Sequence, residues 1–136
     1  MEFEDLAVGQ TASFAKTITE ADILLFAAVS GDTNPVHIDA EAAAASMFKQ
    51  RIAHGMLSAS LISTVLGTRL PGPGTIYLAQ SLKFRAPVTI GQTVTATVEV
   101  TALDPARRRA TLSTTCTVAG KPVIEGEATI MLPARG

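Results

Sequence analysis

The segment at positions 30–39, Ser-Gly-Asp-Thr-Asn-Pro-Val-His-Ile-Asp, holds a carboxylate and an imidazole five positions apart in a polar loop that contains a proline. Asp32 and His37 carry side chains that can move protons near neutral pH once their surroundings tune them. The same residues also fit a helix end followed by a turn, with Gly31 as the left-handed residue and Asp32 and Asn34 as turn formers. The sequence leaves both interpretations open at this point.

A second segment, Arg-Ile-Ala-His-Gly-Met-Leu at positions 51–57, places a glycine where a long apolar helix is predicted to begin. The backbone N–H of Gly55 would have no partner within that helix and would lie at the positive end of the helix dipole. Such a group suits an oxygen that develops negative charge during a reaction. The alternative is that Gly55 only lets the chain approach the sheet closely where the helix starts.

The helix that begins at His54 or Gly55 is predicted to run to about Arg69, because Pro71 prevents its continuation. Its apolar side chains recur at helical spacing: Leu57, Leu61, Ile62, Val65 and Leu66. No charged residue stands between Gly55 and Thr68 in the sequence, so the helix has no obvious solvent-facing side. We therefore expect other elements to cover it.

Two shorter helices are predicted before it. Thr19 can cap a helix through Asp22, and this helix should end at Gly31. The side chains expected to form its buried stripe are Ile23, Leu24, Phe26, Ala27 and Ala28. Asp39 can cap a short alanine-rich helix over 40–45, and the residues between these two helices are expected to form a loop.

The second half of the chain alternates apolar and polar residues with a period of two, which is typical of strands with one buried face. The apolar residues fall on even positions in four segments: Ile76, Leu78, Leu82, Phe84; Val94, Ala96, Val98, Val100; Leu112, Cys116, Val118; and Ile124, Ala128, Ile130, Leu132. Residues 10–17 can add a fifth strand, and turns fit at 104–105 and 119–120. The predicted fold class is α+β, a curved antiparallel sheet of about five strands wrapped around one long helix, as in the hot-dog fold. A ferredoxin-like or other α+β sandwich would fit the same pattern.

Composition supports one domain over residues 1–136, since 47% of the residues are apolar and 17% are charged. The net charge of −1 argues against nucleic acid as a partner, and the run Arg107 to Arg109 is expected at a solvated hairpin tip. A single cysteine, Cys116, fits a reducing compartment, so we expect a cytoplasmic protein with Cys116 in its core. Neither a signal peptide nor a membrane span is expected from the sequence.

Three strings of residues resemble the MaoC-type hydratases. These are Gly-Asp-Thr-Asn-Pro-Val-His-Ile-Asp at 31–39, Arg-Ile-Ala-His-Gly-Met-Leu at 51–57, and the stretch Leu-Pro-Gly-Pro-Gly-Thr-Ile-Tyr-Leu-Ala-Gln-Ser-Leu-Lys-Phe-Arg-Ala-Pro-Val at 70–88. Within that family the chain is most similar to the short, single-hot-dog (R)-specific enoyl-CoA hydratases that feed polyhydroxyalkanoate synthesis. The likeness extends from about Val8 to Pro133.

This resemblance implies an activity and a set of roles. The activity is hydration of trans-2-enoyl-CoA to (R)-3-hydroxyacyl-CoA without a further cofactor, because coenzyme A is part of the substrate. In family members the site lies at a dimer interface, and we expect a homodimer, because one hot-dog monomer leaves part of its sheet edge and helix face uncovered. The roles it implies for this chain are catalytic for Asp32 and His37, oxyanion binding for Gly55, acyl-pocket lining for Ser63 and Leu66, and a structural role for Asn34. Gly31 and Thr33 occupy positions where relatives differ.

Three other functions remain as alternatives. A hot-dog thioesterase would usually carry a carboxylate on the long helix, whereas the sequence has no Asp or Glu from Gly55 to Leu70. A non-catalytic acyl-CoA binding module would need an effector surface, which one domain of this composition does not suggest. A metal site is disfavoured because caps and a helix start explain the same residues, which are Asp32, His37, Asp39 and His54. Lys83 and Arg85 could meet the phosphates of coenzyme A, although ordinary surface charge explains them as well.

Overall fold

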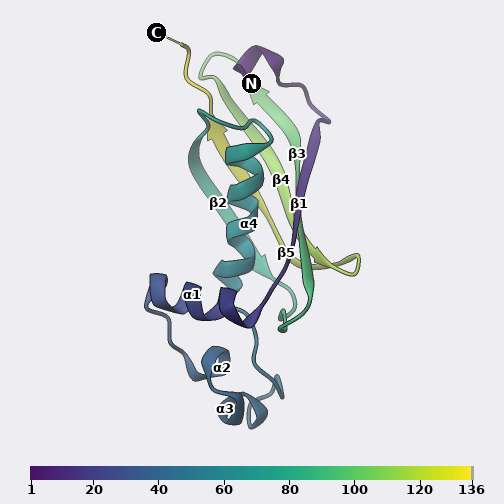
Figure 1. Ribbon diagram of the computed structural model, residues 1–136. Coiled ribbons are helices and arrows are strands. Elements are labelled where there is room, and N and C mark those ends of the chain that lie inside the picture. The colour runs from purple at the N-terminus through teal and green to yellow at the C-terminus, as the bar shows by residue number, and fades with distance from the viewer. Residues whose placement is uncertain (136) are drawn as a thin grey trace.

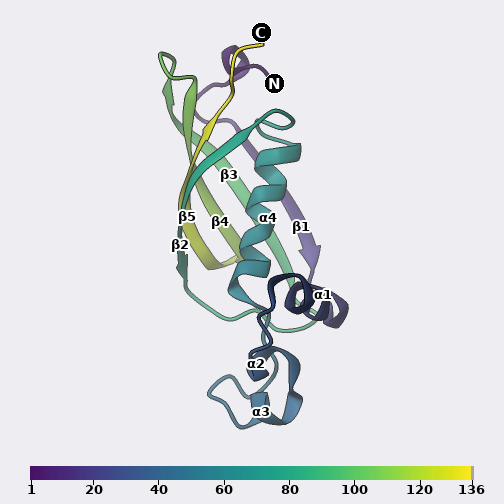
Figure 2. The same cartoon turned by 90° about the vertical axis from the view of Figure 1, so that its left-hand side faces the viewer.

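A five-stranded antiparallel sheet curves around one long helix in the computed structural model, which describes residues 1–135 (Figures 1 and 2). The sheet has the order β1-β3-β4-β5-β2, and each neighbouring pair is antiparallel. The strands are β1 (Thr11–Thr17), β2 (Ile76–Phe84), β3 (Thr93–Asp104), β4 (Arg109–Val118) and β5 (Lys121–Met131). The helices are η1 (Phe3–Asp5), α1 (Glu20–Ser30), α2 (Pro35–Ile38), α3 (Ala40–Ala44) and α4 (Gly55–Thr68). This is the hot-dog arrangement predicted from the sequence, including the fifth strand near the N-terminus.

The inner face of the sheet follows the predicted alternation in its three central strands. The even-numbered side chains of β3 from Val94 to Val100 are fully buried, as are Leu112 and Cys116 of β4 and Ile130 of β5. Helix α4 packs on β3, β1 and β4, so these side chains and the helix form a single core. The turns joining β3 to β4 and β4 to β5 lie at the predicted positions.

Strand β2 departs from the prediction. Ile76 and Leu78 are each 41% exposed and Phe84 is 54% exposed, while Leu82 is half-buried. The physical reason is position, because β2 lies at the edge of the sheet, beyond the strands on which α4 packs. A register shift between Tyr77 and Ala79 also interrupts the alternation within this strand.

Helix α4 has the predicted bounds and buries Leu61, Ile62, Val65 and Leu66 in the core. Only part of its circumference is covered, however. Met56, Ser60 and Ser63 follow one another at helical spacing and are exposed on the opposite side. The expectation that other elements cover the whole helix is therefore wrong for the single chain.

Helix α1 begins at the predicted cap, where the Thr19 hydroxyl accepts the Asp22 backbone N–H and the Asp22 carboxylate accepts that of Thr19. It ends at Gly31, whose φ of 77° is the left-handed conformation that glycine adopts without strain. The predicted stripe is partly wrong, because Leu24 is 48% exposed and Ala28 is exposed. Of that stripe, Ile23 and Ala27 are buried, since α1 lies across the end of α4 rather than along it (Figure 1).

Residues 31–54 form an excursion beyond the end of the sheet that carries α2 and α3 (Figure 2). Asp39 caps α3 as predicted, because its Oδ1 accepts the N–H groups of Glu41 and Ala42. The single turn α2 lies in the segment that was predicted to be a loop. None of the helices described over residues 1–135 combines the length and the apolar character needed to cross a membrane.

The arginine run lies at the tip of the β3–β4 hairpin, as predicted. Arg108 is not simply solvated, because its guanidinium pairs with the Glu4 carboxylate and lies 5.5 Å from the centre of the Phe3 ring. The hydrogen bond from Arg108 lowers the pKa of Glu4 below its ordinary value. Arg108 thus links the N-terminal segment to the hairpin.

Candidate active site

The turn after α1 aims the Asp32 side chain. Asp32 Oδ1 accepts the N–H of Asn34 at 3.2 Å, and Asn34 Oδ1 accepts the N–H of Val36 at 3.2 Å, so that Asn34 caps α2. Pro35 then occupies the first position of α2, where its missing N–H costs nothing. The turn interpretation and the catalytic interpretation of this segment are therefore compatible, since the turn is what presents the carboxylate.

His37 lies on α2 and is 8% exposed. Its Nδ1 is 2.7 Å from the carbonyl oxygen of Ile52. A carbonyl can only accept, so Nδ1 carries a proton, and in the neutral form of the ring Nε2 keeps a lone pair for another partner. Arg51 holds the backbone of the same turn, because its Nε donates to the His37 carbonyl at 2.7 Å while its Nη1 pairs with Glu20 at 2.7 Å.

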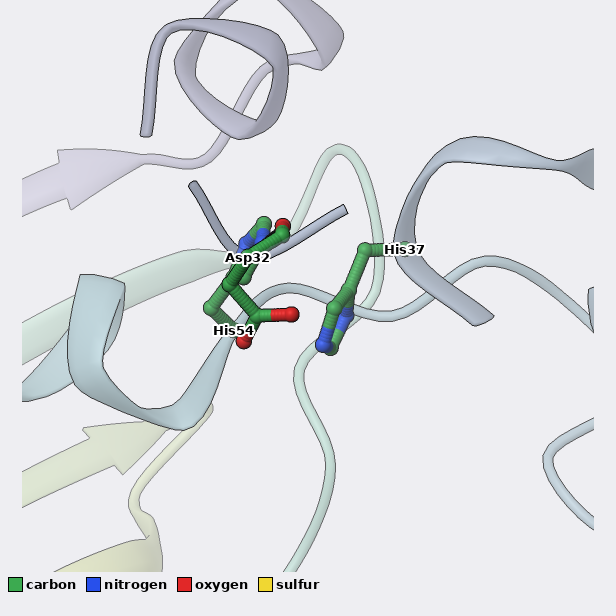
Figure 3. Close-up of side chains that lie close together, drawn as sticks. All are labelled: Asp32, His37 and His54. Atoms are coloured by element: carbon green, nitrogen blue, oxygen red, sulfur yellow. Dashed lines mark hydrogen bonds between the residues drawn. The ribbon is translucent and has the colours of Figure 1, made fainter. Parts of the chain in front are cut away.

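A second buried imidazole, His54, completes the cluster. Its ring stacks on that of His37 with centroids 3.9 Å apart and planes 26° apart, and it tilts against Phe26 at 4.8 Å. Its Nε2 donates to the backbone carbonyl of Asp32 at 2.8 Å. One nitrogen or carboxylate oxygen from each of Asp32, His37 and His54 lies within 4.8 Å of the others. Figure 3 shows the Asp32 carboxylate directed toward the His37 ring, with His54 beside it.

The N-terminus of α4 faces this cluster. His54 is the N-cap residue, and no side chain within residues 1–135 forms a capping hydrogen bond there. The N–H groups of Leu57 and Ser58 bond the His54 carbonyl, whereas within residues 1–135 those of Gly55 and Met56 have no backbone partner and remain available to a ligand. A side chain at Gly55 would meet Phe84, because a Cβ built there would lie 2.6 Å from Phe84 Cε1. Glycine thus also allows the close approach to β2 that the sequence suggested as an alternative.

These groups open into a hollow of about 720 Å³. Its lining includes Asp32, His37, His54, Gly55 and Phe84. The volume lies within the range of 300–1,000 Å³ that is usual for small-molecule sites. Arg85 also lines it and pairs with Glu125 at 3.1 Å.

A second hollow of about 520 Å³ lies between the exposed side of α4 and strand β2. Ser63, Tyr77 and Gln80 line it, while Phe26 and Met56 line both hollows, so the two hollows adjoin at these side chains. Of the two residues expected in the acyl pocket, Ser63 is in this second hollow. Leu66 is buried in the core at 1% exposure and lines neither hollow.

The metal alternative does not fit the geometry of the cluster. Asp39 is used as a helix cap instead of joining the other three residues. The lone pairs of an imidazole lie in the plane of its ring, so two rings stacked with centroids 3.9 Å apart hold their lone pairs in two nearly parallel planes that do not meet close to the rings. A metal ion needs both nitrogens to point at it from about 2.0–2.1 Å, which the stacked pair His37 and His54 does not offer.

The sequence pointed to Asp32, His37 and Gly55 but not to the roles of their neighbours. His54 was singled out only as a possible metal ligand, although its place next to Gly55 was a usable signal. Phe84 lines the site from β2, far from the other site residues in sequence, and Phe26 lines it from α1, and no local pattern marks either as a site residue. Cys116 lines neither hollow and is fully buried in the core, where burial raises the pKa of its thiol to about 11.

The sheet wrapped around one helix, with an acid and an imidazole beside the start of that helix, defines a hot-dog protein of the MaoC type. The family described as "MaoC like domain" matches residues 5–123, and the chain belongs to this family. It is 67% identical over 134 residues to the (R)-specific enoyl-CoA hydratase of Rhodospirillum rubrum, which covers 98% of this chain and 93% of that protein. It is 51% identical over 133 residues to the 3-hydroxybutyryl-CoA dehydratase of Methylorubrum extorquens, with 98% and 85% covered.

Among solved structures, the (R)-hydratase from Aeromonas caviae, described as involved in PHA biosynthesis, has a TM-score of 0.92 and 48% identity. The match covers 96% of this chain and 99% of that one. Relatives and solved structure thus agree with the resemblance found in the three sequence strings.

Proposed function

We propose that this protein is an (R)-specific enoyl-CoA hydratase that adds water to trans-2-enoyl-CoA to give (R)-3-hydroxyacyl-CoA. The observation that carries the proposal is the meeting of the Asp32 carboxylate and the His37 imidazole within 4.8 Å, beside the Gly55 amide at the start of α4. The high identity to a hydratase of this specificity over nearly the whole chain supports it.

One water molecule can bridge the two side chains. Two hydrogen bonds of about 2.8 Å to the same water, at a near-tetrahedral angle, span about 4.6 Å. With His37 in its neutral form, Nε2 holds a lone pair, since the ring proton lies on Nδ1 toward Ile52, and the Asp32 carboxylate has an oxygen left beyond the one that accepts from Asn34. Both side chains therefore accept a hydrogen from the water, whose oxygen lone pair is left to face the substrate.

The chemistry then balances without any other reactant. The water oxygen bonds to the β-carbon of the enoyl group, and one of its protons passes to Asp32 or His37. The electrons of the double bond move to the thioester oxygen, forming an enolate, and the α-carbon receives a proton from the same pair. Because acid and base lie on one side of the substrate, both atoms are added to the same face.

The enolate oxygen is the place where negative charge develops. We propose that the Gly55 N–H at the start of α4 binds it, with support from the partial positive charge of the helix end. A donor of this kind contributes about 10²–10³ in rate. We propose no metal or other cofactor, since the stacked rings of His37 and His54 suit hydrogen bonding better than metal binding.

The acyl chain is proposed to pass Phe26 and Met56 into the second hollow, where Ser63 would border it. Leu66 would act on that pocket from beneath, through the packing of α4, rather than by contact. Asn34 is proposed to be structural, since its side chain caps α2. We propose a cytoplasmic location, because the single cysteine of the sequence is buried and free, which suits a reducing compartment.

A homodimer with the site near the interface is also proposed. Strand β2 lies at the sheet edge and exposes apolar side chains, among them Ile76, Tyr77 and Leu78, next to the exposed row of α4. An unpaired apolar edge of this kind is a liability that a second copy can remove. Light scattering after size exclusion should report a dimer for the parental chain and a monomer for Ile76→Glu, and a parental monomer would contradict the proposal.

The activity is tested by incubating the protein with crotonyl-, hexenoyl- and octenoyl-CoA and following loss of the conjugated double bond. Chiral analysis should show the (R)-3-hydroxy product, and the reverse dehydration should occur with the same catalyst. A thiol reagent in parallel reports free coenzyme A. Release of coenzyme A at the rate of substrate loss would identify a thioesterase, and binding without turnover would identify an acyl-CoA binding module.

A further inference from the structure

His54 contacts the Asp32 loop and the His37 ring and directly precedes Gly55 at the start of α4, although the mechanism above gives it no step. It is 2% exposed, its ring stacks on His37, its Nε2 donates to the Asp32 carbonyl, and its backbone leads directly into Gly55. We infer that His54 is a positioning residue, which holds the carboxylate loop and the His37 ring in register with the N-terminus of α4. The inference rests on the proposed hydratase function.

The bond to Asp32 is what joins the loop to the helix. The other hydrogen bonds of Asp32 are local, because its N–H donates to Ser30 and its side chain accepts from Asn34, each two positions away. The His54 bond instead spans 22 positions. Because a backbone carbonyl can only accept, it also fixes the proton of His54 on Nε2.

The stack on His37 removes the remaining freedom of that ring. The Ile52 carbonyl fixes one nitrogen of His37, and the His54 ring covers one face at 3.9 Å. A ring held at one edge and on one face keeps its free Nε2 in a constant direction. Phe26 packs on His54 in turn, so the cluster is supported from α1.

The alternative is that His54 only fills space where the chain enters α4. Its Nδ1 is buried and has no partner within residues 1–135, so the bond to Asp32 is the polar anchor of the ring. A space-filling role would affect stability alone. A positioning role affects turnover, because misplacing a reacting group by about 1 Å can cost on the order of 100-fold in rate.

The experiment compares two amide variants with the full-length protein. His54→Gln can place its side-chain N–H near the position of Nε2 and keep the bond to Asp32, whereas His54→Asn is one methylene shorter and cannot. We expect Asn to lower kcat on crotonyl-CoA by about 10 to 100-fold with KM changed less than about threefold, and Gln to restore most of that loss. Val98→Ala, which truncates a fully buried side chain of β3, is the control for lost stability and should keep the parental kcat.

A parental kcat in the Asn variant, or an equal loss in Gln and Asn, would overturn the inference. If Asn does not fold, His54→Phe takes its place, because it keeps a stacking ring and lacks the N–H donor. Hydrogen exchange of the amides at 32–34 gives a readout independent of activity, since it should quicken in Asn or Phe and return toward the parental rate in Gln. Absence of hydration by the parental protein would refute the proposed function, while the exchange rates would still decide whether His54 holds the loop.

Discussion

Substitution of Gly55 by alanine tests how the start of α4 and the end of β2 share space. The added Cβ would lie 2.6 Å from Phe84 Cε1 and 2.8 Å from Cδ1, whereas ordinary contact begins at 3.4 Å. The ring must therefore move by roughly 0.8 Å. Phe84 is 54% exposed and can swing outward, so we expect a small loss of stability, about 1 kcal/mol.

Activity should suffer more than stability. Alanine keeps the backbone N–H that is proposed to bind the enolate oxygen, but the displaced ring forms a wall of the hollow. We expect kcat/KM on crotonyl-CoA to fall by about 10 to 100-fold. Gly67→Ala on the same helix is the matched control, because apart from its chain neighbours and the helix's own backbone no atom of residues 1–135 lies within 4 Å of the added Cβ.

Combining Gly55→Ala with Phe84→Ala tests whether the loss of activity comes from the displaced Phe84 ring. Once the ring is removed, Gly55→Ala should cost much less than it does in the parental protein, with a coupling of at least about 1 kcal/mol in the double-mutant cycle. Equal losses in the two backgrounds would refute the reasoning, because they would mean that the methyl group acts without Phe84.

Three further predictions follow from other parts of the fold. Burial raises the pKa of Cys116 to about 11, so a thiol reagent at pH 8 should label only unfolded protein, and rapid labelling of native protein would contradict this. Gly126→Ala would place a Cβ 1.9 Å from a carbonyl oxygen of β2, so urea unfolding should show a loss of about 3 kcal/mol, and an unchanged midpoint would be evidence against that close approach. Hydrogen bonds from Lys16 and then from the Thr19 backbone lower the pKa of Asp22 in the folded protein. The ionised Asp22 carboxylate therefore contributes its full stabilisation of the fold above about pH 4, and this contribution is lost as the pH falls through the lowered pKa. Asp22→Ala should thus cost about 1 kcal/mol at pH 7 and little at pH 2, and a cost that does not depend on pH would argue against the charged cap.

Local chemistry explains why much of the fold was predictable. The cap at Thr19, the left-handed Gly31 and the alternation in β3 each depend on residues close in sequence, and each appears where the sequence places it. The exposure of β2 was not predictable in this way. Its alternation resembles that of β3, but its place at the sheet edge follows from strand order, which no local pattern records.

The candidate site also has parts that local sequence predicts and parts that it does not. Asp32 and His37 share one short segment, so their partnership could be predicted from spacing. The stack of His54 on His37, the ring of Phe84 against Gly55 and the packing of Phe26 require the chain to fold first. The prediction that Leu24 is buried was wrong for the same reason, because a helical stripe shows which side chains share a face but not what covers that face.

The most direct test of the central claim is the single-turnover hydration of crotonyl-CoA by Asp32→Asn and by His37→Gln. Each variant should bind the substrate with near-parental affinity and keep its folded state, while its hydration rate falls by about 10²–10⁴. A folded variant of either kind that hydrates at a near-parental rate would contradict the assignment of this carboxylate and this imidazole to the activated water.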